Sequence, residues 1–125
     1  MAVDPQDLPD RRPVWEALSG LFLDTDVSSG LRLRVEVLAG SPYALAQLQA
    51  ILLDEVYPVC KYNLYTVAGE WVGFDLDWLQ ARILAHQASV LRRFNRFSLG
   101  RRAMARSSEW RDTLAGVQAL RGSPK

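Results

Sequence analysis

The sequence predicts a mostly α-helical protein, a compact bundle of about five helices with one long ordered loop rich in aromatic residues and glycine. Apolar residues recur at spacings of three and four in several segments, and clusters of Gly, Pro and Ser separate those segments. The 125 residues are 49% hydrophobic and 23% charged, which is typical of one globular domain. We therefore expect a single helical domain at residues 11–121, an extended lead-in at 1–10 and a frayed tail at 122–125.

The first helix is expected to begin near Arg11, because the residues before it are acidic, contain prolines and show no apolar periodicity. Pro13 suits the first turn of a helix. Turn-forming and capping residues at 24–30 predict the end of this helix. Its apolar face is formed by Val14, Trp15, Leu18, Leu21 and Phe22.

Residues 31–38 fit two periodic patterns. Apolar and charged residues alternate, as in a strand, but Leu31, Val35 and Leu38 also have helical spacing. The only candidate partner strand lies at residues 64–68, and one short two-stranded pairing is marginal by itself. We therefore predict a helix here and keep a short two-stranded β element at 31–38 and 64–68 as the alternative.

A further helix is predicted from about Pro42 to Val56, with Pro58 ending it, because proline has no backbone N–H and disfavours a helical preceding residue. Residues 59–74 place Gly69 and Gly73 among aromatic side chains, which predicts the long ordered loop. The apolar stripe of this helix is Leu45, Leu48, Leu52 and Val56.

Two more helices are predicted in the second half of the chain. Asp75 is placed to cap the first of them, and Gly100 is expected to break it. Ser107 or Ser108 then caps the last helix. The first has one apolar face, formed by Leu79, Ile83, His86, Val90, Phe94 and Phe97, and the second has Trp110, Leu114, Val117 and Leu120.

The chain has one cysteine, Cys60, and one histidine, His86. No intrachain disulfide can form, and a closed zinc site needs four ligands, so we expect no metal and no cofactor. There is no run of ~18 apolar residues and no basic, apolar export signal, so we expect no membrane partner and a cytoplasmic location.

The charges of the chain are polarised along the sequence. Residues 1–81 carry five basic and twelve acidic side chains, a net charge of −7, whereas residues 82–125 carry ten basic and two acidic ones, a net charge of +8. Fields of opposite sign attract a complementary partner, and they attract each other within one molecule equally well. The charge distribution is therefore compatible with binding of a charged partner and with pairing of the two halves within the molecule.

The most distinctive sequence is the Gly-Glu-Trp-x-Gly-Phe-Asp pattern at residues 69–75. With its surroundings it resembles a family of small bacterial proteins of unassigned function, over about residues 11–84. The resemblance implies a compact helical fold and a bacterial origin, and it brings no catalytic residue. The residues that carry it are Arg11–Leu18, Leu21–Thr25, Asp54–Leu64 and Val67–Asp75.

Acidic residues of the middle of the chain form the first candidate site. Glu55 falls on the same side as the apolar stripe, where a carboxylate must find a partner or have a raised pKa. The favoured reading is that it caps backbone N–H groups of the loop or pairs with an arginine. Glu70 and Trp71 lie between two glycines, either presented on the loop or plugged into the core. The predicted partner-binding residues are Glu55, Glu70, Trp71, Asp75 and Asp77.

An arginine-rich segment at residues 92–106 forms the second candidate site, because it interleaves cations with aromatic and apolar residues as a phosphate-binding surface does. Cations also suit a helix C-terminus, so a solvated or internally paired basic face is the favoured reading. The candidate nucleic-acid-binding residues are Arg92, Arg93, Arg96, Arg101, Arg102 and Arg106.

The sequence contains no phosphate-binding loop, no cluster of metal ligands and no nucleophile triad. We therefore predict a small intracellular protein-interaction module that acts by binding a protein partner, for example an inhibitor or immunity-type protein that occludes a toxin. The alternatives are nucleic-acid binding through the arginines and a carboxylate-based enzyme that uses Glu55 or Glu70. A non-enzymatic role is favoured, and self-association stays open.

Overall fold

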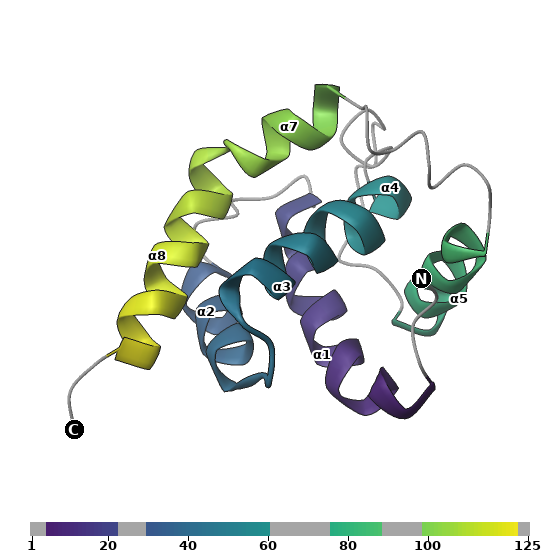
Figure 1. Cartoon of the computed structure of the whole chain (residues 1–125), viewed down its shortest axis with the longest axis horizontal. Helices are drawn as coiled ribbons and strands as arrows, with labels where there is room; N and C mark the ends of the chain where they lie inside the picture. The colour runs from purple at the N-terminus through teal and green to yellow at the C-terminus, as the bar shows by residue number, and fades with distance from the viewer. Residues whose placement is uncertain (1–4, 23–29, 61–75, 89–98, 123–125) are drawn as a thin grey trace.

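The computed structural model describes residues 5–22, 30–60, 76–88 and 99–122, and these residues form helices and short turns, without a strand among them (Figure 1). The mostly α-helical class predicted from the sequence is confirmed. The helices are α1 (Leu8–Ser19), α2 (Leu31–Gly40), α3 (Leu45–Ile51), α4 (Tyr57–Cys60), α5 (Leu76–Gln87), α7 (Leu99–Ala105) and α8 (Ser108–Gly122), with a π-helix, η4 (Leu52–Val56), between α3 and α4.

The chain is already helical before Arg11. A short 3-10 helix, η1 (Pro5–Asp7), leads into α1, so the extended lead-in predicted for residues 1–10 is wrong over the part that the structure describes. Pro9 occupies the first turn of α1, where a missing N–H costs nothing, and Asp10 adds a negative charge at the positive end of the helix dipole. A second 3-10 helix, η2 (Gly20–Phe22), follows α1.

The ambiguous segment at residues 31–38 is helical, as predicted, and lies within α2. The strand alternative fails there, while residues 64–68 lie outside the described residues. The burial pattern agrees with a helix: Arg34 and Leu38 are buried whereas Arg32 and Glu36 are exposed, although all four side chains would share one face of a strand.

Pro58 does not end the helix that contains Val56, contrary to the prediction. The chain continues through η4 into α4, where Pro58 is buried. A proline inside a helix leaves the carbonyl four residues earlier without its donor, here the carbonyl of Asp54. Gln87 of α5 donates its side-chain N–H to that oxygen at 3.1 Å, and the wider π-helical turn precedes the ring.

The second half of the chain departs from the prediction at two points. The helix predicted to reach Gly100 ends as α5 at Gln87, and Gly100 lies inside α7 instead of between helices. Apolar spacing continues in the sequence past the end of α5, so spacing alone could not reveal the break; residues 89–98 lie outside the described residues. The predicted start of α8 is confirmed, because the Ser107 hydroxyl accepts the N–H of Trp110 at 3.3 Å.

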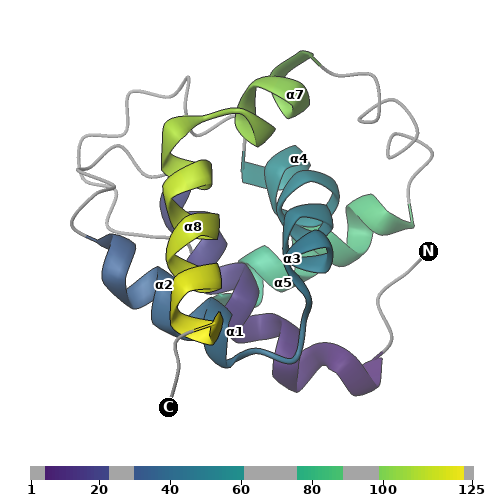
Figure 2. The same cartoon turned by 60° about the vertical axis from the view of Figure 1, so that its left-hand side comes forward.

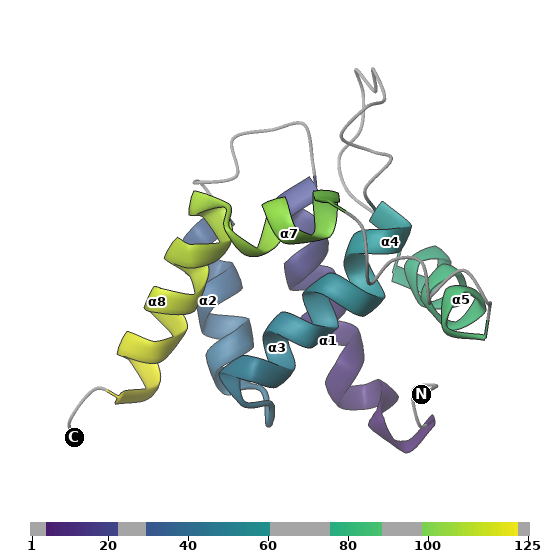
Figure 3. The same cartoon turned by 45° about the horizontal axis from the view of Figure 1, so that its top comes forward.

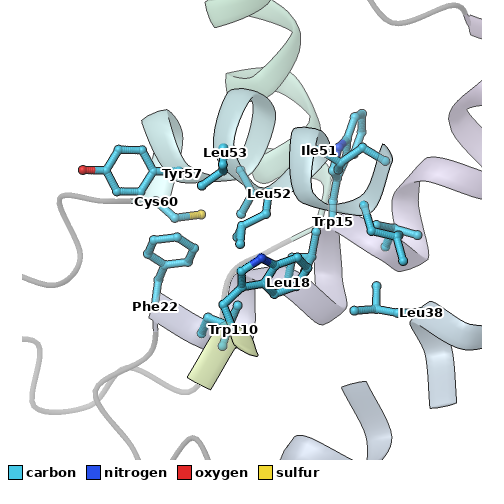
Figure 4. Packing of buried hydrophobic residues seen from close by; sticks show 14 of the residues in the cluster. Trp15, Leu18, Phe22, Leu38, Ile51, Leu52, Leu53, Tyr57, Cys60 and Trp110 are labelled. Atoms are coloured by element: carbon cyan, nitrogen blue, oxygen red, sulfur yellow. The ribbon is translucent and has the colours of Figure 1, made fainter. Parts of the chain in front are cut away.

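One cluster of buried apolar side chains connects the helices (Figure 4). Trp15 of α1 and Trp110 of α8 are its largest fully buried members. Figure 4 shows Tyr57, Cys60 and Phe22 at one end of this cluster and Leu38 at the other. Burial of such side chains stabilises the fold by roughly 1.5–3 kcal/mol each.

The helices α2 and α8 lie side by side at one end of the long axis, and α5 lies at the opposite end (Figures 1 and 3). A view turned by 60° keeps α2 beside α8 (Figure 2). They approach closely at Gly116, where an added Cβ would lie 2.7 Å from Cγ2 of Val35. Near their C-terminal ends, Arg121 of α8 donates to the backbone oxygens of Leu38, Ala39 and Ser41 at 2.9–3.1 Å. Arg121 therefore adds donors at the end of α2, where the Leu38 carbonyl also accepts from the N–H and the hydroxyl of Ser41.

Candidate functional site

Glu55 lies in η4 with its carboxylate directed at α1. Trp15 donates its indole N–H to Oε1 at 2.8 Å, and Nη2 of Arg11 lies 3.3 Å from Oε2. The residue is only 8% exposed. Both carboxylate oxygens are therefore engaged by α1, and of the two kinds of partner expected from the sequence, backbone N–H groups or an arginine, the arginine is present.

Burial raises the pKa of the Glu55 carboxyl, while the hydrogen bond from Trp15 and the charge of Arg11 act in the opposite direction. The Arg11 guanidinium also lies over the ring of Tyr43, 5.0 Å from its centroid. The contacts of Glu55 with Trp15 and Arg11 connect η4 to α1 in the interior of the molecule. Glu55 consequently cannot contribute to an acidic outer surface of the kind expected from the sequence.

Asp77, another predicted partner-binding residue, lies in the first turn of α5 and is exposed. Arg12 of α1 donates to its Oδ1 at 2.9 Å, and the same guanidinium donates to Gln80. Glu70, Trp71 and Asp75 lie outside the described residues. The structure therefore places Asp77 at the edge of α5 that faces α1 and brings it next to a basic side chain.

The outer face of α5 carries an aromatic side chain that the sequence reasoning missed. Trp78 is 44% exposed, and the guanidinium of Arg82, one turn later, lies 5.9 Å from the centre of its rings. The remaining exposed positions of this face are small: Ala81, Ala85 and Ala88. A signal was available, since Trp78 precedes the buried Leu79 by one position and therefore points away from the apolar face. We call Trp78, Arg82 and these alanines the α5 face.

The arginines of α7 and of the turn that follows it divide into two groups. Nε of Arg101 donates to Oδ1 of Asp54 at 3.0 Å, and Nη2 lies 3.0 Å from the same oxygen, so Arg101 pairs internally. Arg102 and Arg106 are exposed, while Arg92, Arg93 and Arg96 lie outside the described residues. Both readings given for the basic segment are thus represented, internal pairing by Arg101 and a solvated surface by the other two.

Cys60 is buried, and burial raises the pKa of its thiol to about 12. We expect folded protein at pH 8 to react with a thiol reagent only through unfolding, since the thiolate is the reactive form. The measurement is the rate of colour release from a disulfide reagent, with urea-unfolded protein as the control. Labelling of the folded protein as fast as that of the unfolded chain would contradict this placement of Cys60.

In the parts of the chain that the structure describes, no group of three or more His, Cys, Asp and Glu side chains is arranged to hold a metal ion. No helix there is both long and apolar enough to cross a membrane.

The fold and these sites define a small all-α protein with an exposed tryptophan–arginine pair and a buried, arginine-paired carboxylate. The chain belongs to the family described as Domain of unknown function (DUF7079), whose model matches residues 9–119. That match extends past the N-terminal resemblance and includes the arginine-rich segment at 92–106. Neither the curated proteins nor the solved structures contain a significant match to this chain.

Proposed function

We propose that this protein is an interaction module that binds a protein partner through the α5 face. The observation that carries the proposal is the exposed indole of Trp78 beside the guanidinium of Arg82. Tryptophan and arginine are the residue types that most often dominate the energy of protein–protein interfaces, because each combines a large contact area with directed polar groups. The alanines around them allow a partner to approach the helix closely.

The chemistry of this face indicates the chemistry of the partner. Asp77 pairs with Arg12 at 2.9 Å, and among the described residues Arg82 is the cation that lies over the indole. The complementary surface is an apolar pocket for Trp78 bordered by a carboxylate for Arg82. Binding of this kind acts by occluding the partner's own surface, which is how an inhibitor or immunity-type protein works.

A site-specific photo-crosslink tests the proposal in bacterial cells, the source that the sequence resemblance implies. We expect benzoylphenylalanine at position 81 to form one dominant adduct with another protein. Trp78→Ala or Arg82→Glu should reduce that adduct at least about tenfold, as removal of an interface hot spot does. The matched control is Leu99→Ala, which truncates an exposed apolar side chain on α7.

Two outcomes would refute the α5 face as the site. One is an adduct that persists unchanged in the Trp78→Ala and Arg82→Glu variants. The other is an equally strong adduct from a crosslinker placed at Ala103, an exposed position of α7. Circular dichroism of each variant establishes that the fold is retained.

Nucleic-acid binding is the second candidate function, supported by Arg102 and Arg106, which are exposed one helical turn apart. It predicts retention on DNA or RNA that is lost steeply with rising salt and is weakened by Arg102→Glu. Carboxylate catalysis has less support, because Glu55 is engaged by Trp15 and Arg11 on the inside of the molecule.

A further inference from the structure

Asp54 of η4 contacts two other helices at once. Its main-chain carbonyl accepts the side-chain N–H of Gln87, in the last turn of α5, at 3.1 Å. Its Oδ1 lies 3.0 Å from both Nε and Nη2 of Arg101 in α7. The segment formed by η4 and α4 lies between α5 and α7 (Figures 1 and 3). A single residue therefore connects a helix on one side of this segment to a helix on another.

The local sequence explains why the Asp54 carbonyl is available to α5. A proline inside a helix has no N–H for the carbonyl four residues earlier, and Pro58 follows Asp54 by four residues. The wide π-helical turn of η4 is a departure from regular helix that occurs frequently at functional sites. On its other side, Glu55 accepts the indole N–H of Trp15 in α1. Contacts from α1, α5 and α7 therefore meet at two consecutive residues of η4.

Helix α7 depends on such contacts more than the longer helices do. It has seven residues, none of which is fully buried, and isolated helices shorter than about 12 residues are marginal in water. Met104 and Ala105 pack against the core while partly exposed. The Arg101 side chain is 25% exposed, and a partly buried ion pair is screened less by solvent than an exposed one. The pair of Arg101 with Asp54 is therefore a substantial part of what docks α7.

We propose that Asp54 couples the docking of α5 to the docking of α7. The carbonyl and the carboxylate belong to one residue, so a rotation of the main chain that breaks the Gln87 bond also turns the carboxylate away from Arg101. The docked and undocked positions of α7 are the two states, and the Gln87 bond favours the docked state. Because coupling free energies are reciprocal, loss of the Arg101 pair also loosens the C-terminal end of α5.

The use of this coupling as a signal rests on the proposed function, whereas the coupling itself belongs to the free chain. A partner bound at the α5 face stabilises α5, and through Asp54 it holds α7 in its docked position. The exposed Arg102 and Arg106 of α7 and its following turn then keep a fixed orientation. Occupancy of the α5 face thereby regulates a basic surface elsewhere on the molecule.

Hydrogen exchange of the free protein, followed by NMR, tests the coupling without a partner, so it can fail independently of the photo-crosslink. The N–H of Arg106 closes the last turn of α7, that of Ala88 closes the last turn of α5, and that of Leu48 closes the first turn of α3, at 2.9–3.2 Å. Arg101→Met should accelerate exchange at Arg106 about fivefold and at Ala88 about threefold, with Leu48 unchanged. Gln87→Leu should accelerate the same two amides.

The double variant Gln87→Leu, Arg101→Met distinguishes coupled from independent contacts. Its acceleration at Arg106 should be well below the product of the two single accelerations, because either substitution already breaks the connection through Asp54. The matched control is Gln80→Leu, which changes another glutamine of α5 whose side chain binds Arg12. Exchange at Arg106 should stay at the wild-type rate in this control.

Asp54→Asn is the mildest variant, because it keeps the carbonyl for Gln87 and changes a side chain that is 48% exposed. It weakens the pair with Arg101 and should accelerate exchange at both Arg106 and Ala88. Unchanged exchange at Ala88 in both Asp54→Asn and Arg101→Met would overturn the coupling. Accelerations that multiply in the double variant would overturn it too, and so would equal accelerations at Leu48, which report unfolding of the whole molecule.

Discussion

Glu55→Ala is expected to lower the free energy of unfolding by about 2–4 kcal/mol, because it leaves the buried indole N–H of Trp15 without an acceptor and removes the ion-pair partner of Arg11. Small domains are stable by only about 5–15 kcal/mol, so this is a large fraction of the total. Thermal unfolding followed by circular dichroism should show Tm lower by roughly 10 °C.

The matched variant is Glu55→Gln, which keeps an oxygen for the Trp15 N–H but removes the charge that faces Arg11. At neutral pH, Glu55→Gln should lower the free energy of unfolding by less than half as much as Glu55→Ala does. If Glu55→Ala were as stable as the wild type, within about 0.5 kcal/mol, the carboxylate would not be what joins α1 to η4.

A comparison of the wild type with Glu55→Gln reports the direction in which stability changes with pH. Burial raises the folded-state pKa of Glu55 above the ordinary value of 4.5. The folded protein therefore binds the carboxyl proton more tightly than the unfolded chain does. The resulting stabilisation is complete below pH 4.5 and is lost as pH rises through the raised pKa. The stability of the wild type relative to Glu55→Gln should therefore fall as pH increases above 4.5. A difference that rises over this range would contradict the direction of the shift.

Gly116→Ala is expected to lower the free energy of unfolding by about 1–2 kcal/mol, although alanine favours a helix by about 1 kcal/mol over glycine. The new Cβ would lie 2.7 Å from Cγ2 and 3.3 Å from Cγ1 of Val35, so α2 and α8 must move apart. Urea unfolding monitored by tryptophan fluorescence measures the loss.

Two further variants separate this clash from a general effect of the substitution. In a Val35→Ala background, Gly116→Ala should cost much less, giving a coupling energy of about 1 kcal/mol or more. Gly122→Ala adds a Cβ that meets no atom within 4 Å and should be neutral or slightly stabilising. Equal losses for Gly116→Ala in both backgrounds would place the cause elsewhere than at Val35.

Helical class could be predicted from this sequence because several apolar stripes have a period that only helices satisfy. Leu79 and Ile83, for example, are fully buried where the spacing placed them. Periodicity reports which face of a helix is buried, and it does so without knowledge of the neighbouring element. Residues 31–38 fit both a helical and a strand period, so the helix was predicted there only because the chain offers no convincing partner strand.

Features that depend on two distant segments could not be predicted. Gln87 supplies a donor to the Asp54 carbonyl where the helix continues past Pro58, and the sequence does not show that these residues meet. The expectation of a partnered Glu55 was sound, but Trp15 as its second partner lies 40 residues away and was hidden within the apolar stripe. Trp78 lies off the apolar stripe of α5, and the stripe does not show whether a large side chain outside it is exposed or covered by another segment.

The contacts of Arg121 with the end of α2 bear on how the chain folds as it is synthesised. Arg121 and the Ala39 carbonyl that it binds are 82 residues apart, and the Arg34 side chain of α2 donates to Thr113 of α8. Native contacts this far apart in sequence form slowly, because a long loop must close first. The α2 helix therefore completes its packing only after α8 has left the ribosome. Until then its apolar side is open to chaperones, and C-terminal truncation before α8 should yield a chain that aggregates.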